Sequence, residues 1–159
     1  MQSTFLKLFF GLALIFGAFV VNASAQGNVD ISGSIGSGKL QKGKTATATI
    51  VMNIPGELHV NSNRPLNRDL IATRVRATGA GLKIGAVSYP RGTNKKFGFS
   101  EEPLSVYEGR TTFRIPVTVP ANFKGDVAKI RVVVNYQSCS NEVCYRPREG
   151  EITLSAAVR

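Results

Sequence analysis

Two cysteines, Cys139 and Cys144, are separated by four residues in this sequence. A pair at this spacing can form a structural disulfide, a redox pair that exchanges disulfides with other proteins, or half of a metal site. Two thiolates favour Cu(I), and Met52 or His59 would have to complete such a site. No pattern in the sequence brings either residue to the cysteines, so copper carriage is the weakest of the three interpretations.

The short separation of the cysteines argues against a purely structural disulfide. In the loop-entropy model, closing so small a loop constrains the unfolded chain by only about 2 kcal/mol, whereas a bridge across about 70 residues would contribute about 4–5 kcal/mol. Thiol exchange uses neighbouring pairs, because a second thiol must resolve the mixed disulfide. Spacing alone leaves the structural and the redox interpretations open, since hairpin disulfides without a redox function are also common.

Residues 1–25 have the features of a secretory signal peptide. Lys7 is followed by 14 consecutive apolar residues, 8–21, and by the small-residue cleavage pattern Ala23-Ser24-Ala25. A membrane anchor would need about 20 apolar residues, so a signal peptide is favoured. We therefore expect a single domain over residues 26–159 that is periplasmic and not stably inserted in the membrane after cleavage. Its oxidising compartment favours a disulfide between the two cysteines.

Composition excludes several other classes of function. The 159 residues fit one domain, and the single histidine excludes a multi-histidine metal centre. The chain carries 20 Lys+Arg against 10 Asp+Glu, but these basic residues are scattered. They lack the interleaved aromatic residues of a single-strand nucleic-acid binder. We expect a solvated basic surface that helps to attract acidic partners, and no nucleic-acid binding.

Alternating apolar and polar residues predict the strands that position the cysteines. Period-two alternation, which is typical of half-buried strands, occurs in Thr45–Ile54, Thr111–Val119, Ala128–Tyr136 and Glu151–Val158. Weaker strands fit Val29–Ile35, Leu70–Ala77 and Leu82–Tyr89. Pro and Gly separate these stretches, and no segment after the signal peptide has a convincing helical apolar period. The pattern predicts an antiparallel β-sandwich.

The cysteines lie in the segment that joins two of these predicted strands, Ala128–Tyr136 and Glu151–Val158. A four-residue loop between them would place Cys139 and Cys144 opposite each other at the mouth of a hairpin. Facing residues of antiparallel strands have Cα atoms about 4.5–5.5 Å apart, a separation that a disulfide accepts.

The sequence around the cysteines also resembles a known family. Tyr136-Gln137-x-Cys139 followed by Cys144-x-x-Pro147 is similar to the YQxC…CxxP signature of the N-terminal domain of the DsbD thiol:disulfide interchange reductase. Two further blocks support the resemblance, GELHVNSNRPL at 56–66 and FGFSEEPLSVYEG at 97–109. It extends over about residues 40–158, and the chain resembles the short stand-alone members most. The resemblance implies an all-β, immunoglobulin-like antiparallel β-sandwich of about seven to nine strands.

The resemblance implies a redox role for the cysteine pair. Domains of this family relay electrons to exported thioredoxin-fold proteins, of the disulfide isomerase or cytochrome c maturation type, by thiol–disulfide exchange and without a cofactor. Cys144 matches the cysteine that forms the mixed disulfide with partners, which leaves Cys139 as the resolving thiol. No metal ligands are implied.

The resemblance also implies a cap over the disulfide that swings away when a partner docks. The matching loop is Phe99–Tyr107, and its candidate cap side chains are Phe99, Leu104 and Tyr107. Ordinary core packing is the alternative for these three. Residues expected to shape the site are Tyr136, Gln137 and His59. A lone histidine at a strand end is usually a packing or surface residue, so we assign no proton transfer to His59.

The sequence departs from the family in two ways. Four residues separate the cysteines, whereas the full-length reductases typically have five or more. The sequence also contains neither the membrane electron-conducting domain nor the C-terminal thioredoxin domain of those reductases, so a separate electron donor is expected. The alternative function is a non-catalytic immunoglobulin-like binding module, in which the hairpin disulfide merely holds a recognition loop.

Overall fold

The computed structural model describes residues 28–159, and the predicted signal peptide lies outside this part of the chain. All regular structure in these residues is β-strand, and none of it is a helix that could cross a membrane. Seven strands have four or more residues: β1 (Asp30–Ile35), β3 (Thr45–Asn53), β5 (Arg74–Thr78), β8 (Leu104–Tyr107), β9 (Arg110–Thr118), β10 (Val127–Tyr136) and β12 (Arg148–Val158). Five are shorter: β2 (Lys39–Leu40), β4 (His59–Asn61), β6 (Lys83–Ile84), β7 (Thr93–Lys95) and β11 (Ser138–Cys139).

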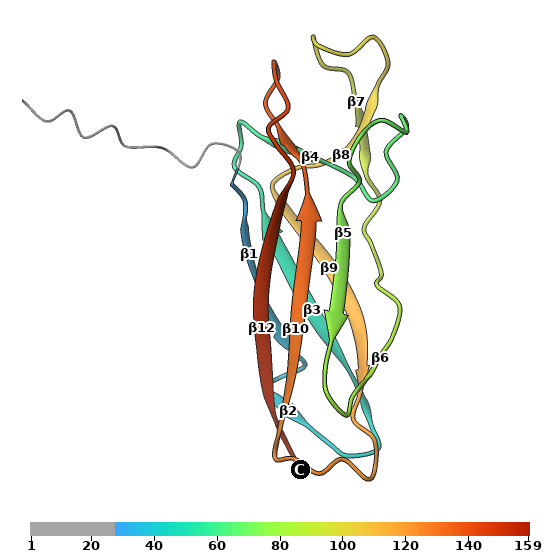
Figure 1. Ribbon diagram of the computed structural model, residues 1–159, viewed down its shortest axis with the longest axis vertical. Helices are drawn as coiled ribbons and strands as arrows, with labels where there is room; N and C mark the ends of the chain where they lie inside the picture. Colours follow the sequence, from blue (N-terminus) through green and yellow to red (C-terminus); the bar gives the residue numbers. More distant parts are fainter. Residues whose placement is uncertain (1–27) are drawn as a thin grey trace, which may run out of the picture.

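Two four-stranded sheets face each other and form the body of the molecule (Figure 1). Their strand orders are β1-β3-β9-β6 and β2-β12-β10-β5. Neighbouring strands are antiparallel except β2 and β12, which run parallel over two residue pairs at the edge of the second sheet. The predicted all-β sandwich is therefore confirmed, with one short parallel pairing that the sequence pattern did not indicate.

The core of the sandwich is apolar and comes from the alternating faces of the long strands. In β9 every second side chain is buried, namely Phe113, Ile115 and Val117, and β10 and β12 follow the same rule. Burying a side chain of this size contributes about 1.5–3 kcal/mol. Since β1, β3, β9 and β10 together supply most of the large fully buried side chains, the sandwich core is the main source of stability.

A third and smaller sheet lies at one end of the sandwich, with the antiparallel order β11-β4-β8-β7. The β10–β12 hairpin reaches this end: β10 finishes at Tyr136, and after Gln137 the chain enters β11 and pairs with β4. The tip of that hairpin and the loop between β7 and β8 project from the same end (Figure 1). Cys139 therefore belongs to the small sheet, and Cys144 faces it through an isolated bridge outside the named strands.

The four strongly alternating stretches match β3, β9, β10 and β12 to within three residues at each end. Of the weaker predictions, Val29–Ile35 matches β1 to within one residue, and the other two were less accurate. In Leu70–Ala77 only the last four residues are strand, and they belong to β5 (Arg74–Thr78). Leu82–Tyr89 contains the short β6 and Ser88, which forms an isolated bridge with Arg114. The strands of the small sheet were not predicted, because β4 and β8 are buried on both faces and do not alternate.

Candidate functional site

Cys139 and Cys144 form a disulfide at the tip of the β10–β12 hairpin, with 3.9 Å between their Cα atoms. They face each other as an isolated antiparallel pair. The Ser140 amide donates to the Val143 carbonyl at 2.8 Å, and the Tyr145 amide donates to the Ser138 carbonyl at 2.9 Å. These two bonds flank the cysteines, so the disulfide occupies a non-hydrogen-bonded position, where facing side chains lie closest.

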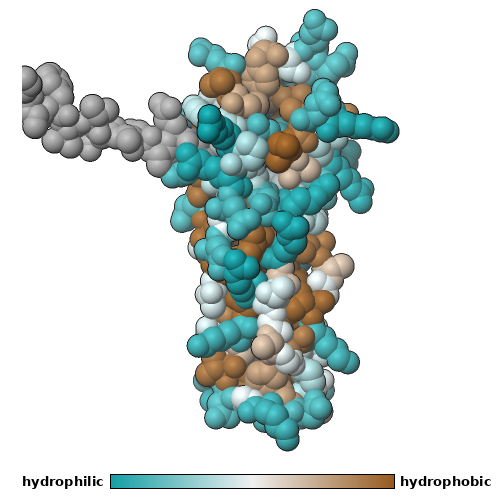
Figure 2. Space-filling view, in the orientation of Figure 1, coloured by the Kyte–Doolittle hydropathy of each residue, from teal (hydrophilic) through white to brown (hydrophobic). Residues whose placement is uncertain are grey.

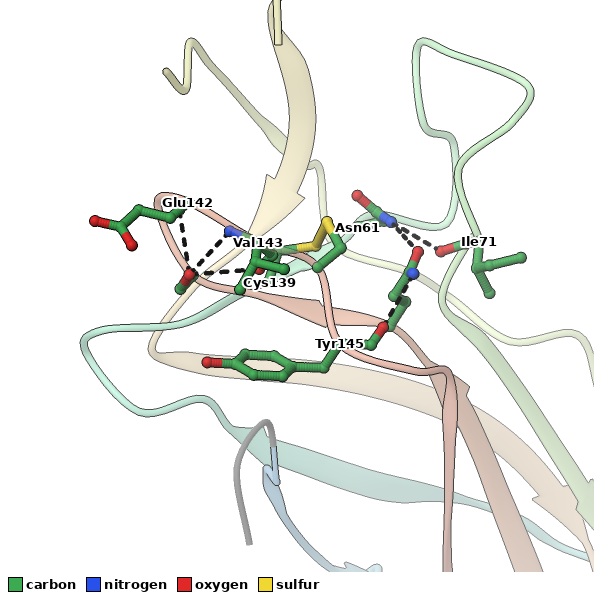
Figure 3. Close-up of a disulfide and its surroundings, with 9 residues drawn as sticks. Asn61, Ile71, Cys139, Glu142, Val143 and Tyr145 are labelled. Atoms are coloured by element: carbon green, nitrogen blue, oxygen red, sulfur yellow. Dashed lines mark hydrogen bonds between the residues drawn. A yellow bond between two sulfur atoms is a disulfide. The ribbon is translucent and has the colours of Figure 1, made fainter. Parts of the chain in front are cut away.

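The loop between the cysteines is fixed by the hydroxyl of Ser140. This oxygen accepts hydrogen bonds from the amides of Glu142, at 3.2 Å, and Val143, at 3.1 Å (Figure 3). Serine at the start of a tight turn often satisfies the turn amides in this way. The turn leaves the Val143 side chain 52% exposed, directly before Cys144.

The two sulfur-bearing residues differ in exposure. Cys139 is completely buried, whereas Cys144 is partly exposed. Thiol exchange requires a thiolate to reach one sulfur of the disulfide, and access decides which sulfur is attacked. Cys144 is therefore the more accessible of the two cysteines.

His59 lies opposite Cys139 in the register of β4 and β11. Paired residues of antiparallel strands project from the same face of the sheet, with Cβ atoms about 5 Å apart. The histidine is only 2% exposed, and its buried Nε2 has no hydrogen-bond partner within the described residues. Burial lowers the pKa of His59; the Glu108 carboxylate opposes this effect and the Lys95 ammonium adds to it. The residue paired with Cys139 is therefore a buried imidazole, and its burial favours the neutral form.

Three aromatic rings are stacked beside the disulfide. The His59 and Phe97 ring centroids are 3.9 Å apart with an interplanar angle of 15°, and Phe97 stacks in turn on Phe99 at 5.6 Å. Phe97 is buried, whereas Phe99 is 39% exposed at the outer end. We did not single out Phe97 from the sequence; its only signal was its place at the start of the 97–109 block.

The three candidate cap residues occupy different positions. Phe99 forms the outer end of the ring stack. Leu104 is buried with Phe97 and Val106 in a small cluster that is separate from the main core. Tyr107 belongs to the main core, and its hydroxyl donates a 2.7 Å hydrogen bond to the side chain of Asn63. The structure thus brings Phe99 and Leu104 to the side of Phe97 and His59, and places Tyr107 in the sandwich interior.

Gln137 connects the hairpin to β4. Its side-chain carbonyl accepts a 3.3 Å hydrogen bond from Asn61, and its amide donates to the Tyr145 carbonyl at 3.1 Å (Figure 3). The Asn61 amide also donates to the Ile71 carbonyl at 3.2 Å. Gln137 therefore holds the residue that follows Cys144. The third residue expected to shape the site, Tyr136, is buried in the main core.

The surface at this end of the molecule combines apolar and charged groups. Phe99 and Val143 are two of the exposed large hydrophobic residues, and brown, apolar atoms lie among hydrophilic ones around the upper end in Figure 2. Within residues 28–159, no three His, Cys, Asp or Glu side chains are grouped so that they could hold a metal ion. The arrangement can support thiol–disulfide exchange, because Cys144 is partly exposed and the apolar side chain of Val143 precedes it at the surface.

The chain is similar to a known protein family and to solved structures. The family model for the N-terminal domain of the thiol:disulfide interchange protein DsbD matches residues 37–156. Among curated protein sequences, none matches the chain. The structure is similar to the reduced N-terminal domain of DsbD from Neisseria meningitidis, with 19% identity over 69% of this chain and 80% of that chain, and a TM-score of 0.44.

A second solved structure shares the fold. The N-terminal periplasmic domain of ScsB from Proteus mirabilis is 12% identical, with a TM-score of 0.51. The match covers 80% of this chain and 44% of the ScsB chain, so the present chain spans less than half of that structure.

Proposed function

We propose, from the premise that the chain belongs to the DsbD N-terminal domain family, that it exchanges electrons with thioredoxin-fold proteins through the Cys139–Cys144 disulfide. One observation carries the assignment of roles: Cys139 is completely buried and Cys144 is partly exposed. Cys144 is the partner-facing thiol and Cys139 is the resolving thiol. The protein acts in the periplasm, a location supported by the shared fold of the ScsB domain, which is described as periplasmic.

Reduction of the pair proceeds in two exchanges. A thiolate of a separate donor attacks the Cys144 sulfur, a bond forms between the two proteins, and Cys139 leaves as a thiolate that takes up a proton. The second donor thiol then attacks the donor sulfur of this mixed disulfide and releases Cys144 as a thiolate. The donor leaves oxidised, and two electrons remain on the cysteine pair.

Delivery to a partner reverses these roles. The Cys144 thiolate attacks the disulfide of an oxidised thioredoxin-fold protein, such as a disulfide isomerase or a cytochrome c maturation factor, and displaces one partner thiolate. Cys139 then attacks Cys144, the Cys139–Cys144 disulfide forms again, and the second partner thiolate leaves. No cofactor takes part, since sulfur atoms carry both electrons throughout.

Phe99 acts as the removable cap in this scheme. It is exposed, it ends the ring stack above His59, and it lies in the loop between β7 and β8. Leu104 anchors that loop in the small cluster, and Tyr107 anchors it in the main core. A docking partner displaces Phe99 and packs on the exposed side chain of Val143, which precedes Cys144 in the chain.

Trapping of mixed disulfides tests this proposal. Cys139→Ser leaves the exposed thiol without its resolving partner and should accumulate a mixed disulfide with periplasmic thioredoxin-fold proteins, identified by mass spectrometry after non-reducing electrophoresis. The matched control is Cys144→Ser, which keeps only the buried thiol and should trap little. Equal trapping by the two variants would contradict the assigned roles.

A binding module with a structural disulfide gives a different result. Its disulfide would resist reduced thioredoxin and have a reduction potential below about −300 mV. Partner binding would then be unchanged in the double variant Cys139→Ser, Cys144→Ser. Either observation would contradict the electron relay and favour a binding module with a structural disulfide.

A further inference from the structure

The buried Nε2 atom of His59 has no hydrogen-bond partner within residues 28–159. Buried polar side-chain atoms are almost always paired, because an unpaired one loses its water without compensation. The disulfide form of the protein therefore keeps an unsatisfied nitrogen beside its redox centre. A disulfide sulfur has no proton to donate, whereas the thiol of reduced Cys139 has one.

The packing holds the imidazole in place for such a contact. His59 and Cys139 are register partners on β4 and β11, so their side chains share one face of the small sheet. Phe97 stacks on the ring at 3.9 Å and fixes its plane. Because the backbone pairing and the stacking do not involve the sulfur–sulfur bond, they can persist when that bond is reduced.

We infer that His59 is the general base for Cys139, accepting a hydrogen bond from the thiol in the reduced state and taking its proton during resolution of the mixed disulfide. This inference rests on the proposed function. The imidazole Nε2 accepts the proton of Cys139 as the Cys139 sulfur attacks the Cys144 sulfur. The bond between Cys144 and the partner breaks, the partner sulfur leaves with the electron pair, and the imidazolium returns the proton to that thiolate.

Cys139 requires a base because it is completely buried. Burial in apolar surroundings disfavours the thiolate, yet the thiolate is the species that attacks. The exposed Cys144 can lose its proton to water instead. The asymmetry that separates the two cysteines therefore also explains why only one of them has the histidine beside it.

Burial, more than the surrounding charges, lowers the pKa of His59 and keeps its imidazole able to accept a proton. Lys95 of β7 and Glu108, which follows β8, both act on the ring, and they form a salt bridge with each other. Their opposite effects on the histidine partly cancel, and burial makes the largest contribution. Resolution by Cys139 should therefore slow in acid, where His59 gains a proton from solvent and can no longer accept one.

The kinetic test uses glutathione disulfide as the probe and the reduced protein as the reactant. Acid quenching and mass spectrometry separate formation of the mixed disulfide at Cys144 from its resolution by Cys139. In His59→Phe, which keeps an aromatic ring for Phe97, the first phase should stay within about twofold and resolution should slow at least about tenfold at pH 7. His59→Gln, which can accept a hydrogen bond but not a proton, should be similarly slow.

The pH profile separates this role from a packing role. The deficit of His59→Phe should shrink as pH rises, because Cys139 then ionises without a base. A deficit of equal size at every pH, or resolution as fast as in the wild type, would overturn the inference. The proposed function itself has failed if the reduced wild-type pair does not react with glutathione disulfide and the oxidised pair does not react with reduced thioredoxin.

A second measurement needs no variant. The sequence contains one histidine, so nitrogen NMR of the untagged protein reports on His59 alone. Reduction of the disulfide should shift the Nε2 resonance, because a hydrogen bond from the Cys139 thiol appears. An identical Nε2 resonance in the oxidised and reduced protein would overturn the inference even if His59→Phe does not fold.

Discussion

The sandwich and the small sheet are built on opposite principles. The sandwich buries apolar side chains from long alternating strands, whereas the small sheet uses strands of two to four residues and buries polar groups within them. Among the buried polar residues of the small sheet are His59, Asn61, Ser105 and Ser138. Within the described residues, the long strands of the two large sheets contain one buried polar residue, Thr111, which lies near the start of β9.

The difference assigns separate tasks to the two regions. Apolar packing gives the sandwich its stability, and we expect the fold to persist without the disulfide. The polar groups of the small sheet cost free energy unless they are paired. The side-chain amide of Asn61 is paired, with Gln137 and with the Ile71 carbonyl, whereas Nε2 of His59 has no partner within the described residues.

Truncation of the sandwich core should have the largest effect on stability. Phe113→Ala removes a fully buried ring that contacts Tyr89 and Tyr107 edge-on, and we expect a loss of about 3–5 kcal/mol in the free energy of unfolding. Urea denaturation followed by circular dichroism measures this loss. If Phe113→Ala costs no more than truncation in the small sheet, stability is not concentrated in the sandwich.

Truncation in the small sheet should cost less stability and change reactivity more. Phe97→Ala removes the ring between His59 and Phe99, and because its cluster is small we expect a loss of about 2 kcal/mol. The same change should speed reduction of the disulfide by dithiothreitol, since it uncovers the site. Val127→Ala, an exposed apolar truncation in the sandwich, serves as the control and should leave the reduction rate unchanged.

Reduction of the disulfide should lower stability only modestly. The loop that it closes is short, with a sequence separation of 5, which corresponds to about 2 kcal/mol in the loop-entropy model. Denaturation in the presence and absence of reductant measures the difference. If the protein unfolds when the disulfide is reduced, the disulfide is structural and the sandwich is not stable without it.

Acid should weaken the folded protein slightly through His59. Its pKa is lowered in the folded state, so the unfolded chain binds the proton first, and this contribution to stability is present above about pH 6.5 and lost as pH falls below it. One proton limits the slope to about 1.4 kcal/mol per pH unit. The stability difference between wild type and His59→Phe at pH 7 and pH 5.5 isolates the effect; an unchanged difference would contradict it.

The smallest effect is expected on the outer face of the sandwich. Arg131 and Glu151 form a hydrogen-bonded ion pair between β10 and β12, and both side chains are exposed to water. Solvent screens such pairs strongly. Arg131→Ala should leave both the urea midpoint and the rate of disulfide reduction nearly unchanged, which makes it a surface control for the other variants.

The sequence predicted the sandwich better than the small sheet for a physical reason. Strands such as β9 have one face in the core and one in water, so their residues alternate. β4 and β8 are covered on both sides, and three or four consecutive buried residues of mixed polarity carry no periodic signal. Their existence depends on pairing between distant segments, which composition does not reveal.

The site was predictable only in part for the same reason. The spacing of Cys139 and Cys144 within a hairpin was sufficient to place them opposite each other. The position of His59 beside Cys139 depends on the pairing of β4 with β11, and the stack on Phe97 depends on the path of the β7–β8 loop. The sequence predicted His59 as a residue that shapes the site without proton transfer, and only its register with Cys139 suggests the further role that we infer for it.

The origin of the small sheet has a consequence for how this protein can diverge. Its strands come from three separate connections of the sandwich: β4 lies between β3 and β5, β7 and β8 lie between β6 and β9, and β11 lies between β10 and β12. Connections tolerate substitution and changes in length better than packed strands do. Substitutions in these three connections at one end of the molecule can therefore change which partners bind. The strands that form the sandwich core can keep their sequence.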